Sequence, residues 1–366
     1  MTTPQTTPQQ SPARRRRTLL VVGGVVVVAL LVGALAAVVV WRSGDRSPLL
    51  RAMALAPDDT QRYLWTDWAA VRRQLDVPAR PAALPDLLEA GHTADLTSTS
   101  AMVDSAAGLA ESLGVSPATA SWELFAQADD GALVVVGLRS GDADRVTRAL
   151  DRAGYERDGE IWDGAALQGA LGIAPEFTYV AVEDDRLLAS DALAYLREAL
   201  AEDGDPEEPV TNAADALGEP LSAVVYTGDH ACSALALSGG DDTDQAQGEE
   251  LVRQAGGVSP LASFAMGVVS KGSTDEDGST DEDGSTDARV RVVLGFEHHD
   301  QAVGDADARA TLASGPAPGQ GGDFADRFEL GEVRASGSVV TMELDPVEGA
   351  YVLSDLSSGP VLFASC

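Results

Sequence analysis

Lysine is almost absent from this sequence, and basic residues of any kind are scarce. Lys271 is the single lysine, and 25 Lys and Arg stand against 58 Asp and Glu, which gives a formal net charge of −33. A surface this acidic repels phosphate groups, so we expect no binding of nucleic acid or anionic headgroups by charge. The acidity has two explanations: solubility in a salty medium or a GC-rich genome, and a specific cationic partner.

Histidine is also scarce, and the familiar catalytic motifs are missing. His298 and His299 are adjacent, so their side chains diverge on a strand or a helix and make a poor chelate. His230 and Cys232 supply two ligands, too few for a closed zinc site. The sequence has no Gly-x-Ser-x-Gly elbow, no Walker phosphate loop and no His-Glu-x-x-His. We therefore predict no catalytic residue, no metal site, no cofactor and no enzymatic activity.

Cysteine occurs only twice, at Cys232 and Cys366. Their separation matches no metal-binding spacing. In an oxidising compartment such a pair is often a disulfide, and a bridge to the last residue would hold down a terminus that otherwise frays. Cys232 and Cys366 are therefore a candidate disulfide, and the alternative is two unrelated thiols.

Only one apolar run is long enough to cross a membrane. Residues 18–40 carry no charge, and with Trp41 they form a predicted transmembrane helix at 18–41. The uncharged residues cover about 34 Å as a helix, enough for a hydrocarbon core of ~30 Å. The run is longer than a signal-peptide core, which predicts an uncleaved signal anchor. Four arginines precede it and favour a cytoplasmic N-terminus, namely Arg14, Arg15, Arg16 and Arg17.

This anchor gives the chain its expected arrangement in the cell. We predict a disordered cytoplasmic tail at residues 1–17, a stalk at 42–60, and a large acidic remainder outside the cytoplasm. The expected location is the plasma membrane, crossed once, with the bulk of the chain extracytoplasmic. The membrane itself is then a partner, and other envelope proteins or lipids are further candidates.

The soluble part alternates between strand and helix patterns, which predicts an α+β fold. Residues 133–138 are continuously apolar, and residues 288–297 alternate between polar and apolar, as strands do. The order of strand, helix, strands and helix recurs weakly along the chain. We expect antiparallel sheets with helices on one face, arranged in two related lobes at 61–201 and 221–366.

Two polar segments interrupt this pattern. The acidic, proline-containing stretch after residue 201 predicts a linker at 202–220. The sequence Gly-Ser-Thr-Asp-Glu-Asp is repeated within 271–287, which predicts a disordered acidic loop in the second lobe. The spacing of its acids does not fit a calcium-binding loop of the EF-hand type.

Aromatic residues make up 5% of the chain, which is low for a sugar-binding groove. Trp65 and Trp68 lie three positions apart and could form a small aromatic platform for a lipid or sugar. The alternative is structural: Trp68 packs a helix onto the sheet, and Trp65 completes a strand.

Three short motifs carry a resemblance to a known group of proteins. They are YLWTDW at 63–68, WELFAQ at 122–127 and LLAS at 187–190, with SPAT at 116–119 before the second. In these motifs the chain resembles an uncharacterised actinobacterial family of single-pass membrane-anchored proteins. More distantly, its layout is similar to mycobacterial envelope proteins of polar growth and mycolate-lipid trafficking. The resemblance covers most of residues 60–200 and implies no catalytic residue.

The leading functional hypothesis is a membrane-anchored extracytoplasmic binding or scaffolding protein of the cell envelope. It depends on an anchor, a large folded part and the lack of recognisable chemistry. Two alternatives remain. A lipid-carrying accessory factor would need an apolar cavity of a few hundred Å³. A carboxylate-based hydrolase would need a concave cluster of acids with raised pKa values.

Overall fold

The computed structural model describes residues 46–201, 203–237, 240–270 and 288–366. Within these ranges, no helix has both the length and the apolar character that crossing a bilayer requires. The predicted cytoplasmic tail with Arg14–Arg17, the transmembrane helix at 18–41 and the acidic loop at 271–287 lie outside the described residues. Residues from Ser47 to Cys366 form one compact unit.

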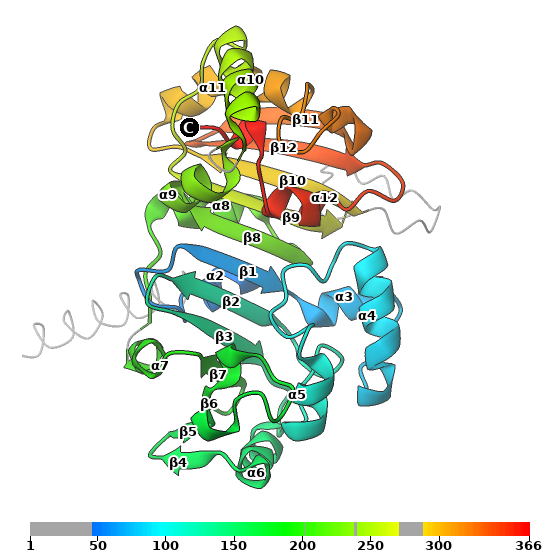
Figure 1. Ribbon diagram of the computed structural model, residues 1–366, viewed down its shortest axis with the longest axis vertical. Coiled ribbons are helices and arrows are strands. Elements are labelled where there is room, and N and C mark those ends of the chain that lie inside the picture. Colours follow the sequence, from blue (N-terminus) through cyan, green and yellow to red (C-terminus); the bar gives the residue numbers. More distant parts are fainter. Residues whose placement is uncertain (1–45, 202, 238–239, 271–287) are drawn as a thin grey trace, which may run out of the picture. The chain divides into compact units, whose positions relative to one another are not determined.

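The described residues form a 12-stranded sheet in which all neighbours are antiparallel (Figure 1). Its order is β11-β12-β10-β9-β8-β1-β2-β3-β7-β6-β5-β4. The predicted α+β class, with a large antiparallel sheet and helices, is confirmed. The strands are β1 (Arg62–Thr66), β2 (Glu123–Ala128), β3 (Gly131–Gly137), β4 (Glu156–Asp158), β5 (Ile161–Asp163), β6 (Tyr179–Val182), β7 (Arg186–Ser190), β8 (Ser222–Thr227), β9 (Ser263–Ser270), β10 (Ala288–Gly295), β11 (Phe328–Ser336) and β12 (Val339–Pro346).

Helices cover both faces of the sheet, and the prediction of helices on one face is wrong. A sheet that is apolar on both faces needs a cover on each, and each face has its own buried core. One core includes side chains of α2 (Pro48–Met53), α7 (Leu193–Ala201) and α8 (Glu208–Leu217). The other is covered by α3 (Trp68–Gln74), α4 (Leu84–Thr93), α5 (Ala106–Ser112), α6 (Ala143–Ala153), α10 (Asp242–Gln254), α11 (His299–Ala313) and α12 (Val352–Ser357).

Two segments that we expected to be connecting chain belong to the folded unit. Part of the predicted stalk forms α2, whose Leu49 and Met53 are 1% and 0% exposed. Part of the predicted linker forms α8, whose Val210, Ala213 and Leu217 are buried at helical spacing. Both predictions fail for the same reason: a few apolar residues at the spacing of a helix outweigh the flanking prolines and acids.

The strand order repeats across the middle of the sheet. The first half runs β1-β2-β3-β7-β6 and the second runs β8-β9-β10-β12-β11, with β1 and β8 paired at the centre. Strands β4 and β5 are additions to the first half. The two expected lobes therefore share one continuous sheet.

The backbone contacts at the central pair repeat in the same way. The amide of Asp67 donates to the carbonyl of Leu221 (2.8 Å), and the amide of Thr227 donates to that of Gln61 (2.9 Å). Each donor residue also caps a helical turn. Asp67 precedes α3 and Thr227 precedes α9 (Gly228–His230), and each side chain accepts a bond from the backbone amide three residues later.

Candidate functional site

Trp65 and Trp68 do not form an exposed aromatic platform, and that prediction is wrong. Their exposed fractions are 2% and 0%, and they belong to the cores on opposite faces of the sheet. The ring of Trp65 stacks on that of Trp122 at 5.6 Å. The Nε1–H of Trp68 donates to Glu123 Oε2 at 3.0 Å. The structural alternative explains both residues.

These contacts join two of the motifs that carry the family resemblance. Trp65 and Trp68 come from YLWTDW, and Trp122 and Glu123 begin WELFAQ. Strands β1 and β2 are neighbours, so the two motifs lie side by side, with one tryptophan contact on each face. The motifs therefore hold the first half of the sheet together.

Glu123 is a fully buried carboxyl that takes part in packing. It accepts bonds from Trp68, from the hydroxyl of Ser100 (2.6 Å) and from the amide of Met102 (3.0 Å). Burial raises the pKa of Glu123, because taking a carboxylate out of water outweighs these donors. Its contacts fasten the segment around residues 100–102 to the sheet.

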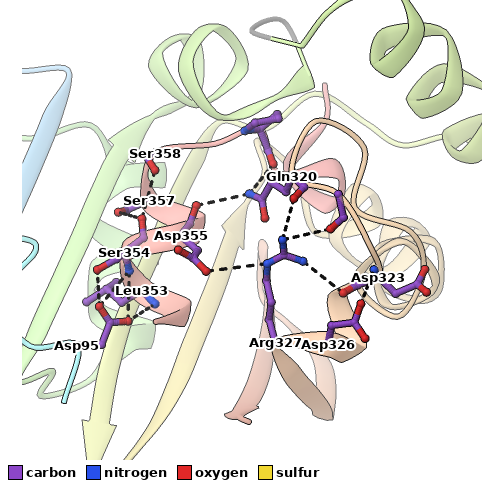
Figure 2. A network of polar contacts seen from close by, with 12 residues as sticks. Asp95, Gln320, Asp323, Asp326, Arg327, Leu353, Ser354, Asp355, Ser357 and Ser358 are labelled. Carbon is purple, nitrogen blue, oxygen red and sulfur yellow. Dashed lines mark hydrogen bonds and ion pairs between the residues drawn. The ribbon is translucent and has the colours of Figure 1, made fainter. Parts of the chain in front are cut away.

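Asp95 is a second buried carboxyl, in a different place (Figure 2). Its carboxylate accepts from the amide of Leu353 (2.6 Å) and from the hydroxyl of Ser354 (2.5 Å), at the start of α12. Burial raises the pKa of Asp95. Arg327, near the other side of α12, has its Nε 3.9 Å from Asp355. Asp95 and Glu123 thus hold separate segments and do not form a pair.

Cys232 and Cys366 are joined by a disulfide, with their Cα atoms 5.7 Å apart. The bridge ties the end of the chain to the turn after α9. The preceding residues, 361–364, are buried. The guanidinium of Arg309, itself 0% exposed, donates to the carbonyls of Phe363 (2.7 Å) and Ser365 (2.6 Å). The terminal segment is therefore held by packing and by Arg309 as well as by the disulfide.

A larger candidate site is a cleft of about 730 Å³ where β1 begins and β8 ends. We call it the acidic cleft. Its buried floor includes Tyr63, Val210 and Leu261, from β1, α8 and the chain before β9. Gly228 also lines it, and a Cβ there would lie 2.3 Å from the carbonyl oxygen of Leu261. The close approach of these two backbones requires glycine at this position.

The walls of the acidic cleft carry one sign of charge. Among the described residues, six exposed carboxylates and no lysine or arginine line it. None of the six forms an ion pair with another residue of this described part. Unpaired charges of one sign around a concave surface concentrate the negative potential there. The six are Asp58, Asp59, Asp129, Glu207, Asp229 and Glu297.

The neutral side chains of the cleft do not offset this charge. Thr60 donates to the carbonyl of Pro57 (2.7 Å), so its oxygen accepts from the phenol of Tyr195 (2.9 Å). Burial raises the pKa of Tyr195 to about 12, and burial also raises that of Tyr63. Burial, and secondarily Arg62, lower the pKa of His230. The phenols and this imidazole are therefore all neutral at pH 7.

The acidic cleft could not be found from the sequence. Its carboxylates come from five separate segments, and no spacing in the chain marks them among 58 acids. His230 and Cys232 lie on consecutive helical turns, and Cys232 is in the disulfide. Within the ranges that the structure describes, no group of His, Cys, Asp and Glu could hold a metal ion.

Comparisons with known proteins add little to this geometry. No family model and no curated protein matches the sequence. A solved structure that matches is TP0453 in its crystal form I, with 9% identity and a TM-score of 0.38. The match covers 85% of this chain and 97% of that one. A likeness this distant carries no argument about function.

Proposed function

We propose that this protein is a membrane-anchored, extracytoplasmic binding or scaffolding protein of the cell envelope. We further propose that its partner is cationic and binds in the acidic cleft. The chemistry of the partner is a group of ammonium or guanidinium charges, such as a polyamine or a basic peptide segment carries.

The acidic cleft is the observation that carries this proposal. Its volume of about 730 Å³ falls in the range of sites that bind small molecules or peptide segments. Six carboxylates that form no ion pair with a described residue repel one another across it, and a bound cation would remove that repulsion.

The proposed location has support of its own. A disulfide between Cys232 and Cys366 persists in an oxidising compartment, which the space outside the cytoplasm provides. The uncharged run at 18–40 and the arginines before it favour the same orientation. The lipid-carrying and hydrolase alternatives stay predictions.

The test is the binding of a fluorescent hexa-arginine peptide to the full-length protein in nanodiscs of neutral lipid. The variant D129N/D229N/E297Q removes three charges from the cleft. A matched control, E329Q/E332Q/E348Q, removes three exposed charges elsewhere. We expect the cleft variant to bind about tenfold more weakly, from roughly 0.5 kcal/mol for each exposed charge pair. We expect the control to stay within about twofold of wild type.

Two outcomes would count against the proposal. Equal losses in both variants would mean that the peptide responds only to overall charge. No measurable binding at low salt would mean that the cleft does not take this class of ligand.

A further inference from the structure

The first half of the sheet contains an addition that the second half lacks. Strands β4 and β5, with the loop at residues 164–178 that follows them, stand outside the strand order that the two halves share. An addition to a repeated scaffold is not needed for the order of the sheet. Any contribution of this addition to function therefore comes from its own surface.

The 164–178 loop lines a half-open pocket of about 340 Å³, here called the loop pocket. None of the described residues that line it is charged, in a chain with 23% charged residues. Most of them are apolar, and Gln168 and Thr178 supply polar groups. The lining consists of Tyr155, Gly164, Leu167, Gln168, Gly169, Leu171, Ile173, Ala174, Pro175, Phe177 and Thr178.

The floor of the loop pocket is fixed by hydrogen bonds and close packing. The phenol of Tyr155 donates to the carbonyl of Phe177 at 2.9 Å. A Cβ on Gly164 would lie 2.4 Å from the ring of Tyr155, so only glycine fits against that ring. The amide of Ala174 donates to Ser105 Oγ at 2.8 Å, which ties the loop to the segment before α5. The pocket is therefore built into the fold.

The charge distribution indicates what the loop pocket can hold. An anionic ligand is repelled by a protein with a formal net charge of −33. A cation finds no carboxylate in this lining, and leaving water for an apolar wall costs it several kcal/mol. An uncharged apolar group meets neither the charge repulsion nor the desolvation cost, and burying its surface is favourable. The volume lies at the small end of the range for ligand pockets.

We infer that the loop pocket binds an uncharged, apolar small molecule, or the apolar end of one, about the size of a substituted aromatic ring. This site is separate from the acidic cleft and does not depend on the function proposed for it. The two sites share no lining residue.

The test is photolabelling of the full-length protein in nanodiscs with two matched probes. One is the neutral trifluoromethyl phenyl diazirine, and the other is its para-carboxylate. Labelled positions are mapped by mass spectrometry on the tryptic peptide between Arg157 and Arg186, so that labelling within the membrane is not counted. We expect the neutral probe to label this peptide about tenfold more than the carboxylate does.

Two variants and a control make the result specific. L171D places a charge in the lining and should lower labelling about tenfold, because an apolar probe would have to displace water from the carboxylate. A174F should lower it by filling the space. V303D adds the same charge at a side chain that is 56% exposed and outside the pocket, and should leave labelling unchanged. Thermal unfolding checks that each variant is folded.

The inference would be overturned if the neutral probe labelled this peptide no more than the rest of the soluble part. Equal labelling of wild type, L171D and A174F would overturn it as well. Equal labelling by both probes would contradict the argument from charge. Because D129N/D229N/E297Q should not affect this labelling, failure of the cleft proposal and failure of this one are distinguishable.

Discussion

Trp68 and Glu123 show how single side chains join segments that lie far apart in the sequence. Trp68 begins α3 and Glu123 begins β2, and their hydrogen bond is fully buried. If a donor to a buried carboxyl is removed, the carboxyl oxygen has neither that hydrogen bond nor a water molecule in its place. The resulting loss of stability is larger than the net contribution of the hydrogen bond. Trp68, which the sequence made a candidate for an aromatic platform, instead holds α3 to the sheet.

Replacing Trp68 with Phe removes that donor. We expect W68F to lower the free energy of unfolding by about 1–3 kcal/mol. The matched control is W162F, where the lost donor serves Asp151, an exposed acceptor that water can satisfy. Urea unfolding measures both. An equal loss in the two variants would mean that only ring volume matters at Trp68.

The pKa of Glu123 predicts how stability changes with pH. Its folded value is raised above the unfolded one, so the native state holds the proton more tightly. The contribution of Glu123 is therefore present below the unfolded pKa of about 4.3 and is lost as pH rises through the folded pKa. Asp95 acts in the same direction.

The variant E123Q removes one of these two groups. We expect wild type to lose more stability than E123Q between pH 4 and the folded pKa of Glu123. Thermal melts across this range measure the difference. Parallel curves would show that Glu123 has the same proton affinity in the folded and unfolded states.

Among the elements, those with a strong apolar signal were predictable and those held by tertiary contacts were not. The apolar run of β3 and the alternating pattern of β10 were both recognised from the sequence. Strand β2, with the sequence ELFAQA, has no β-branched residue and becomes a strand because β1 and β3 flank it. Helix α10 has Gly248 as its single buried residue, so no periodicity marked it.

The acidic cleft was beyond prediction for a related reason. Its floor depends on the pairing of β1 with β8, which brings Gln61 and Thr227 together across more than 160 positions of sequence. Nothing local in the chain indicates that pairing. The disulfide, in contrast, could be anticipated as a candidate because only two cysteines are present.

The disulfide gives a prediction for the C-terminal segment. We expect C366S to lower the free energy of unfolding by about 2–4 kcal/mol, because the bridge closes a long loop in the unfolded chain. The segment should nevertheless stay in place, since Arg309 and buried side chains hold it. Carboxypeptidase digestion of folded C366S should therefore remain slow. Rapid digestion would mean that the bridge alone retains the terminus.

The described part of the chain from Ser47 to Cys366 is built on a single sheet with two covered faces, an acidic cleft at the central strand pair and a neutral loop pocket in the first half. Its charge decides which partners can approach: cations are attracted to the cleft, and anions are repelled from the surface. In the proposed topology, the anchor places this surface outside the cytoplasm. Partners would then come from the envelope or from the medium beyond it.

The location of every proposed partner depends on the orientation of the chain across the membrane. This orientation is tested with a membrane-impermeant maleimide on intact cells that carry the variant V303C. Val303 lies on α11, and its side chain is 56% exposed. A second variant, T6C in the N-terminal tail, serves as the control. We expect V303C to be labelled in intact cells and T6C to be labelled only after lysis. Labelling of T6C in intact cells, with V303C protected until lysis, would contradict this orientation.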